Sequence, residues 1–466
     1  MVANEIDSSF NLRKMAPLIA VLLSGAFITI LNQTLLGTAL PPIMNDLQIT
    51  ESTVQWLQSV FMLVNGIMIP VTAFLIERFT TRKLFLTAMS LFTIGTLTCA
   101  IAPGFTTLLI GRILQASGAG IMMPLMQTIM FLIFPVNKRG TAMGIFGLVI
   151  SFAPAIGPSL SGWLVDQFPW QSVFIVVLPI AVVNVIAAYF LLKNVTEQTN
   201  PKVDIPSIIF STLGFGGILY GFSIAGNVGW QSMHVVLSLI IGILSLTIFI
   251  RRQTKLEQPM LEFNVFKYKI FALSTGLSMI VFVSMIGTAV ILPLYMQNML
   301  GFSAFHSGLV LLPGALIMGF MNPITGRLFD RFGARWLTII GFFLLTVTTL
   351  MFTGLTEETS FLYLSVGNAI RMLSIAMVMM PVTTAGLNEL PKELIPHGTA
   401  MSNTFRQVSG AIGTAMLITV MAMFTISYGG VQGSIHGVNV SFIFASIISL
   451  IGFILSFQVK KPKAVT

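Results

Sequence analysis

Apolar segments of about 20 residues recur from one end of this 466-residue chain to the other. A helix of that length crosses the roughly 30 Å of hydrocarbon in a bilayer. Only 8% of the residues are charged, whereas soluble proteins carry about 25%. The sequence therefore predicts an all-α polytopic membrane protein with about fourteen transmembrane helices. The predicted spans are 15–38, 54–75, 84–103, 106–134, 140–164, 170–192, 204–226, 233–250, 270–293, 304–325, 335–354, 361–386, 398–425 and 438–459.

The charged residues outside these spans divide between the two membrane faces. If the N-terminus is cytoplasmic, every Lys and Arg of the loops and tails lies on the cytoplasmic side. The opposite loops then carry acidic residues only, Asp46, Glu51, Asp166, Glu357 and Glu358. This positive-inside asymmetry predicts a multi-pass protein of the cell membrane, which we expect to be bacterial, with both termini in the cytoplasm. Since topology explains the net charge of +9, membrane lipids are expected partners and nucleic acid is not.

The sequence offers little for catalysis or for a bound cofactor. Cys99 is the single cysteine, which excludes an internal disulfide and argues against a metal cluster. The four His residues fall at predicted helix ends or in loops, and no buried carboxylate or His pair supplies a nucleophile with its base. We therefore expect no enzyme activity, no metal and no cofactor.

Short motifs repeat within the chain at a shared offset of roughly 255 residues. Glu77-Arg78-Phe79 recurs as Asp330-Arg331-Phe332, and the run 140–143 recurs as 398–401. Six helices with their loops need nearer 200 residues, at about 30 residues for each helix and loop. The repeat offset is longer than this by about the length of one helix pair. This predicts two six-helix bundles with two extra helices between them. The expected boundaries are 1–195 for the first bundle, 196–262 for the insert and 263–466 for the second bundle.

Both copies of the first motif extend into a longer signature. Residues 73–83 and 326–335 resemble the loop signature Gly-x-Leu-x-Asp-Arg-x-Gly-Arg-Lys of the major facilitator superfamily, and the second copy is the better match. In that family the acid and the arginines of this loop latch the cytoplasmic ends of the two bundles together. The resemblance therefore implies latch roles for Glu77, Arg78, Asp330, Arg331 and Arg335.

Two further motifs narrow the resemblance. The pattern Arg112-x-x-Gln115-x-x-Gly118-x-Gly120 is similar to the family's fourth-helix signature, whose arginine is associated with proton coupling. Pro154, Gly157, Pro158 and Gly162 resemble the fifth-helix signature of exporters, in which small residues let helices approach and Pro kinks a helix. With fourteen helices, this implies a fourteen-helix drug:proton antiporter. Residues 31–41 and 403–407 look most like the lincomycin-resistance type of multidrug exporter.

Three arginines, Arg112, Arg371 and Arg406, fall inside the apolar segments, and no carboxylate joins them. An isolated arginine at the bilayer centre costs roughly 2.5 to 3.5 kcal/mol or more, so it must face a cavity or a partner. Each is either a structural arginine bonded to carbonyls and helix ends or a cavity-facing cation. A cavity-facing cation binds an anionic or hydrogen-bond-accepting group, or modulates a titrating neighbour.

Polar and Met side chains at helical spacing predict which helix faces line a cavity. Amides in a membrane also join helices to one another, so both roles stay open at each position. The candidates for substrate contact are Asn32, Gln33, Gln55, Gln58, Asn65, Arg112, Gln115, Met122, Met126, Asn368, Arg371, Asn403, Arg406 and Gln407.

Asn32 stands where exporters of organic cations in the wider family commonly carry an acidic residue. An amide neither takes up a proton nor pairs with a cation, so Asn32 retains only hydrogen bonding. Any coupling proton must then use another group. The candidates near helix ends are Asp166, Glu77, Asp330, Glu389 and Glu393, together with Arg112 by resemblance.

These observations predict a secondary active multidrug exporter that works as a monomer. It would move amphiphilic small molecules outward by alternating access, with protons as the coupling ion. Because the apolar segments contain three arginines and no carboxylate, we expect neutral, zwitterionic or anionic substrates rather than permanent cations. The alternative on the same fold is a flippase or an exporter of a lipid or an anionic metabolite such as a cyclic nucleotide.

Overall fold

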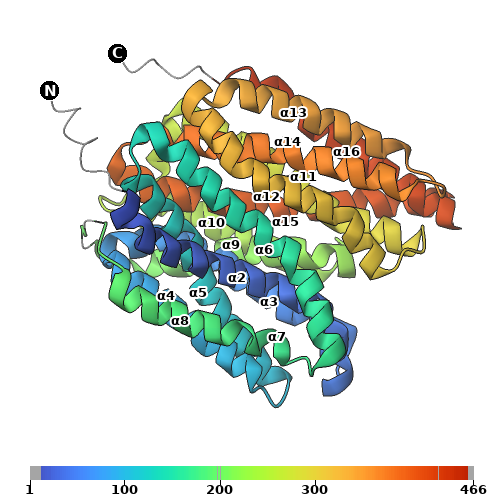
Figure 1. Ribbon diagram of the computed structural model, residues 1–466, viewed down its shortest axis with the longest axis horizontal. Helices are drawn as coiled ribbons and strands as arrows, with labels where there is room; N and C mark the ends of the chain where they lie inside the picture. Colours follow the sequence, from blue (N-terminus) through green and yellow to red (C-terminus); the bar gives the residue numbers. More distant parts are fainter. Residues whose placement is uncertain (1–11, 197, 200, 429, 460–466) are drawn as a thin grey trace.

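The computed structural model describes residues 12–196, 198–199, 201–428 and 430–459. Within them, fourteen helical segments are long and apolar enough to cross a membrane, which confirms the predicted all-α architecture. The two bundles lie side by side in Figure 1, the first in blue to green and the second in yellow to red.

The helices fall into three groups along the chain. The first bundle comprises α2 (Leu12–Leu47), α3 (Glu51–Arg78), α4 (Thr81–Ala100), α5 (Phe105–Ile133), α6 (Arg139–Gln167), α7 (Ser172–Ile175) and α8 (Val177–Leu191). The insert comprises α9 (Ile205–Val228) and α10 (Met233–Gln253). The second bundle comprises α11 (Lys269–Asn298), α12 (Ala304–Phe332), α13 (Ala334–Met351), α14 (Phe361–Asn388), α15 (Ile395–Tyr428) and α16 (Gly430–Ser456).

Several helices extend beyond their predicted spans. Helix α2 reaches Leu47 and carries Pro41 and Pro42 inside it, although the apolar run that predicted it ends near residue 38. A helix ends where its backbone hydrogen bonds end, and a hydropathy span only marks where it enters polar surroundings. In the opposite sense, the predicted sixth span is interrupted at Val176, which separates α7 from α8.

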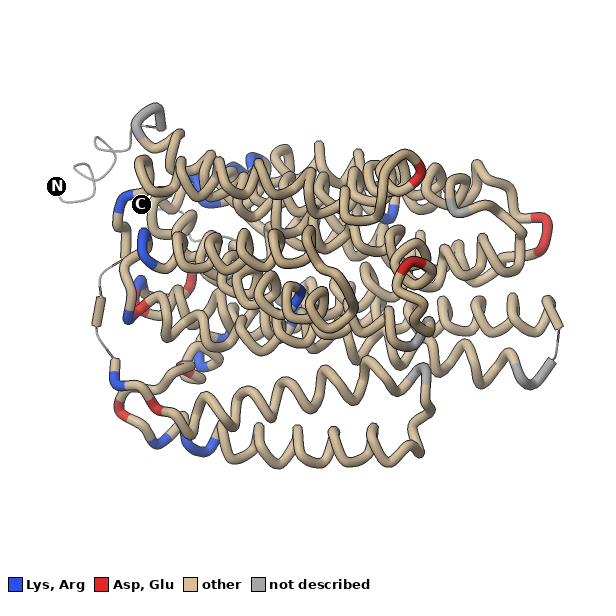
Figure 2. Tube along the Cα trace, turned by 90° about the horizontal axis from the view of Figure 1, so that it is seen from below, with Lys and Arg blue, Asp and Glu red and all other residues tan. Residues whose placement is uncertain are grey.

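Lys and Arg are distributed unevenly along the helix axes, whereas Asp and Glu occur at both ends, as Figure 2 shows. Lys and Arg gather at one end, where α3 finishes at Arg78 and α6 begins at Arg139. We call this the basic end. The opposite end carries Asp and Glu, and Asp46 before the start of α3 and Asp166 at the end of α6 lie at the far ends of the helices that carry Arg78 and Arg139. The residues that bear the two chain termini, 1–11 and 460–466, lie outside the described residues, so their predicted location stays a prediction.

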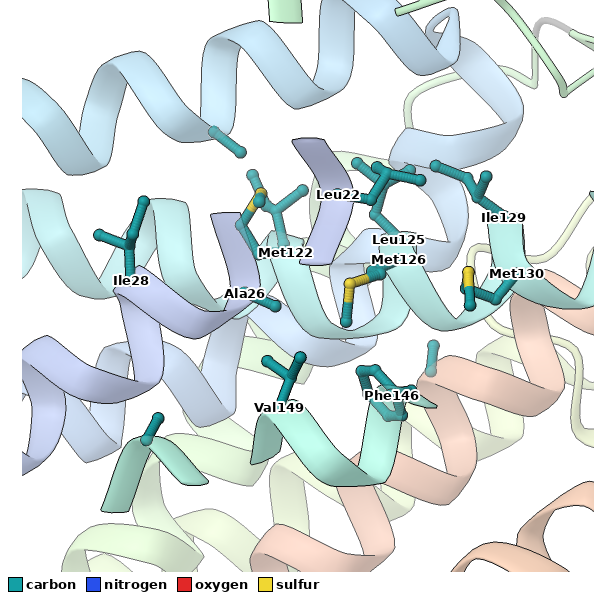
Figure 3. Packing of buried hydrophobic residues seen from close by; sticks show 14 of the residues in the cluster. Leu22, Ala26, Ile28, Met122, Leu125, Met126, Ile129, Met130, Phe146 and Val149 are labelled. Atoms are coloured by element: carbon teal, nitrogen blue, oxygen red, sulfur yellow. The ribbon is translucent and has the colours of Figure 1, made fainter. Parts of the chain in front are cut away.

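The interior of the first bundle is a packed apolar cluster. Leu22 and Ala26 of α2, Met122 and Met126 of α5, and Phe146 of α6 meet there (Figure 3). The Met side chains fill the space between the three helices and are at most 1% exposed. Flexible thioether side chains suit such irregular gaps, because they adopt many rotamers at low cost.

The two bundles touch backbone to backbone near the basic end. Gly140 at the start of α6 faces Gly326 of α12, and a Cβ added to Gly326 would lie 2.2 Å from the carbonyl oxygen of Gly140. No side chain fits in that distance. The two glycines therefore let α6 and α12 approach more closely than any other residue pair allows.

The insert packs on the other side of the bundle interface. Helix α9 contacts both α3 of the first bundle and α15 of the second, whereas α10 packs against α9. Trp230, between α9 and α10, donates from Nε1 to Thr419 Oγ1 of α15 at 2.7 Å. Arg252 at the end of α10 makes two hydrogen bonds to Asp204 before α9, at 2.7 and 2.8 Å. The insert is thus a closed hairpin that spans both bundles.

We expect Gly326→Ala to lower the melting temperature of the purified protein. The added methyl group meets backbone, which cannot rotate away, and overpacking of this kind costs roughly 1 to 3 kcal/mol. Gly162→Ala is the matched control, because a Cβ there meets nothing within 4 Å and Ala is the better helix former. Thermal unfolding in detergent measures both. Equal effects of the two substitutions would contradict the close-contact explanation.

Candidate functional site

Asp330 of α12 holds the first turn of α6 across the bundle interface. Its carboxylate accepts hydrogen bonds from Gly140 N at 2.7 Å, Thr141 N at 2.8 Å and Thr141 Oγ1 at 2.6 Å. The N-cap residue of α6, Lys138, supplies no side-chain cap. The unpaired N–H groups and positive dipole of a helix start favour a carboxylate, so Asp330 caps α6 from the opposite bundle.

Glu77 makes the matching contact in the other direction. It lies at the end of α3, and its Oε1 is 2.8 Å from Nε2 of His397 in the first turn of α15. The backbone N–H of Glu262, before α11, donates to His397 Nδ1 at 3.2 Å. Because Nδ1 accepts, Nε2 carries the ring hydrogen and donates it to Glu77. The internal repeat thus produces two latches, and the second pairs a carboxylate with an imidazole.

The arginines of the two loop motifs do not make these contacts. Arg78 donates to the carbonyl oxygen of Pro201, in the segment that leads to the insert, at 2.9 Å. Arg331 is exposed, with its guanidinium 5.1 Å from the Phe332 ring centroid, and Arg335 is half-buried. In the described part of the chain, the two carboxylates therefore carry the latch contacts of these loops.

Further polar contacts join the bundles deeper in the structure. Arg139 Nη1 donates to Asn388 Oδ1 at 2.9 Å, between α6 and α14. Thr128 of α5 and Thr399 of α15 share a hydrogen bond of 2.7 Å. In addition, Asn322 of α12 donates to Ser151 Oγ of α6 at 2.8 Å. Together with the two latches, these contacts close the basic half of the interface.

Arg112 is held within the first bundle. Its Nε donates to the Leu57 carbonyl of α3 at 3.1 Å and its Nη1 to Gln115 Oε1 at 2.9 Å. Gln115 in turn donates to Thr96 Oγ1 of α4 at 2.9 Å. The guanidinium also lies 4.2 Å from the Phe61 ring centroid, where a cation is attracted to the ring face. This arrangement ties α3, α4 and α5 together.

The second bundle holds the other two buried arginines. Arg371 of α14 donates from Nη2 to the carbonyl and hydroxyl oxygens of Ser284 on α11. Arg406 of α15 donates from Nη2 to Asn403 Oδ1, and Asn403 Nδ2 donates across the interface to Gln127 Oε1 of α5 at 2.7 Å. Arg406 therefore belongs to a chain of side chains that links the bundles, and Arg371 does not.

The structure distributes the remaining predicted contact residues over different surroundings. Asn32 is buried, and neither atom of its amide has a hydrogen-bond partner. Met122 and Met126 lie in the apolar cluster of Figure 3, and Asn368 is buried within the second bundle. Half-buried positions are Gln33, Gln55, Asn65 and Gln407, and Gln58 is exposed.

The residues of the exporter signature in α6 also lie in different surroundings. A Cβ on Gly157 would lie 2.1 Å from Thr34 Oγ1 of α2, so this glycine lets α6 and α2 approach closely. By contrast, Gly162 has open space beside it, and Pro154 and Pro158 are exposed. Asp166, the predicted proton carrier at the end of α6, is exposed as well.

Several residues at the interface were missed by the sequence reasoning, and two of them, Gln127 and His397, had a signal in the sequence. Gln127 stands next to Thr128 in an otherwise apolar segment, and a buried amide there needed a partner from another helix. His397 directly precedes the repeated run 398–401, whose other copy receives Asp330. The repeat therefore pointed to His397 as the partner of Glu77.

Comparison with known proteins places the chain in a family. The family described as Major Facilitator Superfamily matches residues 22–414. The chain belongs to the major facilitator superfamily. Family and fold make it a multi-pass membrane transporter rather than an enzyme. Its structure superposes on that of the human organic anion transporter MFSD10 with a TM-score of 0.71, over 95% of this chain and 99% of that one, at 14% identity, which shows the shared fold.

Relatives narrow the group within the superfamily. The chain is 56% identical to a protein of Bacillus subtilis named "Uncharacterized MFS-type transporter YcnB", over 96% of this chain and 95% of the relative. It is 42% identical to the lincomycin resistance protein LmrB of Bacillus subtilis, over 97% of each chain. The multidrug transporter protein MdtP of the same organism is 30% identical, over 88% of this chain and 75% of the relative. The resemblance to the lincomycin-resistance type of multidrug exporter is thus confirmed.

We expect Asp330→Asn to expose the buried interface. The substitution removes the charge from three short hydrogen bonds, and a loss of about 1.4 kcal/mol raises the open population about tenfold. A Cys at position 128, in a Cys99→Ala background, should then react about tenfold faster with a maleimide, because Thr128 is fully buried. Glu389→Gln, an exposed carboxylate beyond α14, is the control. An unchanged rate in Asp330→Asn would show that this carboxylate does not hold the interface closed.

Proposed function

We propose that this chain is a secondary active exporter of amphiphilic small molecules that works as a monomer by alternating access. The closed basic half of the bundle interface is the observation that supports this best. With the basic end in the cytoplasm, as the positive-inside rule requires, a closed basic end corresponds to the state that releases substrate outward. Exchange with a state open to the cytoplasm requires the latches of Asp330 and Glu77 to break.

The full-length likeness to LmrB and the likeness to MdtP support small amphiphilic drugs as the substrate class. The charge of the buried side chains narrows this substrate class further. The membrane-embedded part of the described chain contains three arginines and no carboxylate at mid-depth. A permanent cation would enter a site that already carries positive charge, which costs free energy in a low-dielectric medium. Neutral, zwitterionic and anionic amphiphiles avoid that cost.

Proton coupling is proposed to act at the Glu77–His397 latch. Glu77 contacts a titratable side chain of the other bundle, whereas Asp166 is exposed. The backbone N–H of Glu262 faces the same ring, with its carboxylate turned to Asn264 N, and Arg78 points to Pro201. A proton added to His397 makes both ring nitrogens donors, so the Glu262 bond breaks. A proton added to Glu77 removes the charge that the imidazole N–H binds. The proton on Glu77 weakens the closed latch, whereas a proton on His397 turns the Glu77–His397 contact into an ion pair between the bundles.

Transport into proteoliposomes with an imposed pH gradient tests the proposed function. Three amphiphiles with one apolar body and a cationic, a neutral or an anionic head group are compared. We expect gradient-driven uptake of the neutral and anionic compounds, and slower uptake of the cation. Preferred uptake of the cation would contradict the charge argument. Redistribution of a labelled phospholipid, without transport of any of the three, would favour the flippase alternative.

Glu77→Gln tests the proposed coupling site. We expect gradient-driven accumulation to fall about tenfold, because coupling free energies of 1–3 kcal/mol correspond to factors of that size. Downhill exchange of the same substrate should persist, since Gln keeps the hydrogen-bonding shape of the side chain. Asp166→Asn, which neutralises the exposed carboxylate, should leave accumulation unchanged. Full accumulation in Glu77→Gln would place the coupling proton elsewhere.

A further inference from the structure

Two buried donors at the bundle interface lack an acceptor. Arg406 Nη1 and Gln127 Nε2 are inaccessible to solvent, and neither has a hydrogen-bond partner. Both belong to the chain Arg406–Asn403–Gln127, so they flank the single amide of Asn403. Arg406 is 4% exposed and Gln127 is fully buried. An unpaired donor in such surroundings costs roughly 1 to 3 kcal/mol, more when it is charged.

The kind of unpaired atom separates this cluster from the other buried arginines. Beside Arg371, the unpaired Nε and Nη1 are accompanied by the unpaired acceptor Asn368 Oδ1, one helical turn away. The unpaired atoms around Arg371 thus include both donors and an acceptor. Arg112 has one unpaired nitrogen, Nη2, and its guanidinium lies on the Phe61 ring. In the Arg406 cluster, by contrast, the unpaired atoms are donors on a positively charged site.

Asn403 is the residue of this cluster whose hydrogen bond crosses between the bundles, so its partners change if the bundles separate. Its hydrogen bond to Gln127 crosses from α15 to α5, one turn from the contact between Thr128 and Thr399. Its bond from Arg406 stays within α15. If the basic end opens, α15 leaves α5 and Asn403 Nδ2 loses the Gln127 oxygen, while its bond to the Thr399 carbonyl within α15 remains. Arg406 Nη1 and the Asn403 N–H that Gln127 releases then face the opening space without an acceptor.

We propose that Arg406 and Asn403 bind an anionic oxygen group of the substrate, a carboxylate or a phosphate, when the basic end is open. The inference rests on the proposed export function and names its substrate class. Guanidinium groups bind such oxyanions with charge-assisted hydrogen bonds. On closure, the Gln127 amide oxygen takes the place of the substrate oxygen on Asn403 Nδ2. The neutral amide competes with the anion, so closure of the basic end promotes release toward the acidic end.

Binding to the purified protein in nanodiscs tests this proposal. The probes are three amphiphiles with the same apolar body and a carboxylate, a neutral amide or a quaternary ammonium head. We expect the carboxylate compound to bind the wild type most tightly. Arg406→Gln should weaken its binding at least about tenfold, the loss typical of a charge-assisted hydrogen bond, and leave the neutral compound within about twofold. Gln127→Ala should tighten carboxylate binding, because it removes the competing amide.

Arg371→Gln is the matched control, because it also removes a buried arginine of the second bundle. It should keep the wild-type ratio of carboxylate to neutral affinity, whatever it does to stability. Arg406→Lys keeps the charge and should recover part of that ratio, which distinguishes binding from misfolding. Equal affinity for the three heads, or an unchanged ratio in Arg406→Gln, would overturn the proposal. Failure of the export function appears separately, as absent uptake in proteoliposomes by a protein that still binds the carboxylate compound.

Discussion

The structure depends on how helix ends and buried polar groups are satisfied where water is scarce. A helix that begins between two bundles presents N–H groups that have no partner within the helix itself. In this protein the opposite bundle supplies the partner, since Asp330 of α12 caps α6. The stability of one helix start is thereby tied to the position of another bundle. A structural requirement of α6 thus becomes a contact that holds the interface closed.

The same requirement explains why the two latches differ in chemistry. Asp330 is satisfied by two backbone N–H groups and a hydroxyl, none of which changes protonation in the physiological range. Glu77 instead receives an imidazole N–H, and the same ring is fixed from its other side by Glu262. The Asp330 latch therefore contains one titratable group, the carboxylate itself, and the Glu77 latch contains two. The internal repeat provides the geometry of both, and a single His at position 397 provides the difference.

Much of the fold was predictable because it follows from local patterns. Fourteen spans, the repeat and the two loop motifs all lie in short windows of sequence, and the bilayer enforces their length. The partners across the interface were not predictable in this way. Gln127 and Asn403 are 276 positions apart, and only the packing of α5 against α15 makes them neighbours. Likewise, Arg406 and Arg371 look alike in the sequence, and the difference between them is which atoms around each remain unpaired.

Helix α9 lies against α3 and α15, which are the two helices that carry Glu77 and His397. If these helices part during transport, α9 cannot remain seated on both. Each side offers a specific contact, since Trp230 bonds to Thr419 of α15 and Tyr220 of α9 stacks on Trp56 of α3. The α9–α10 hairpin then covers the interface between the two bundles on this side of the protein. Lipid tails on that side of the protein would be kept away from the contact between α3 and α15.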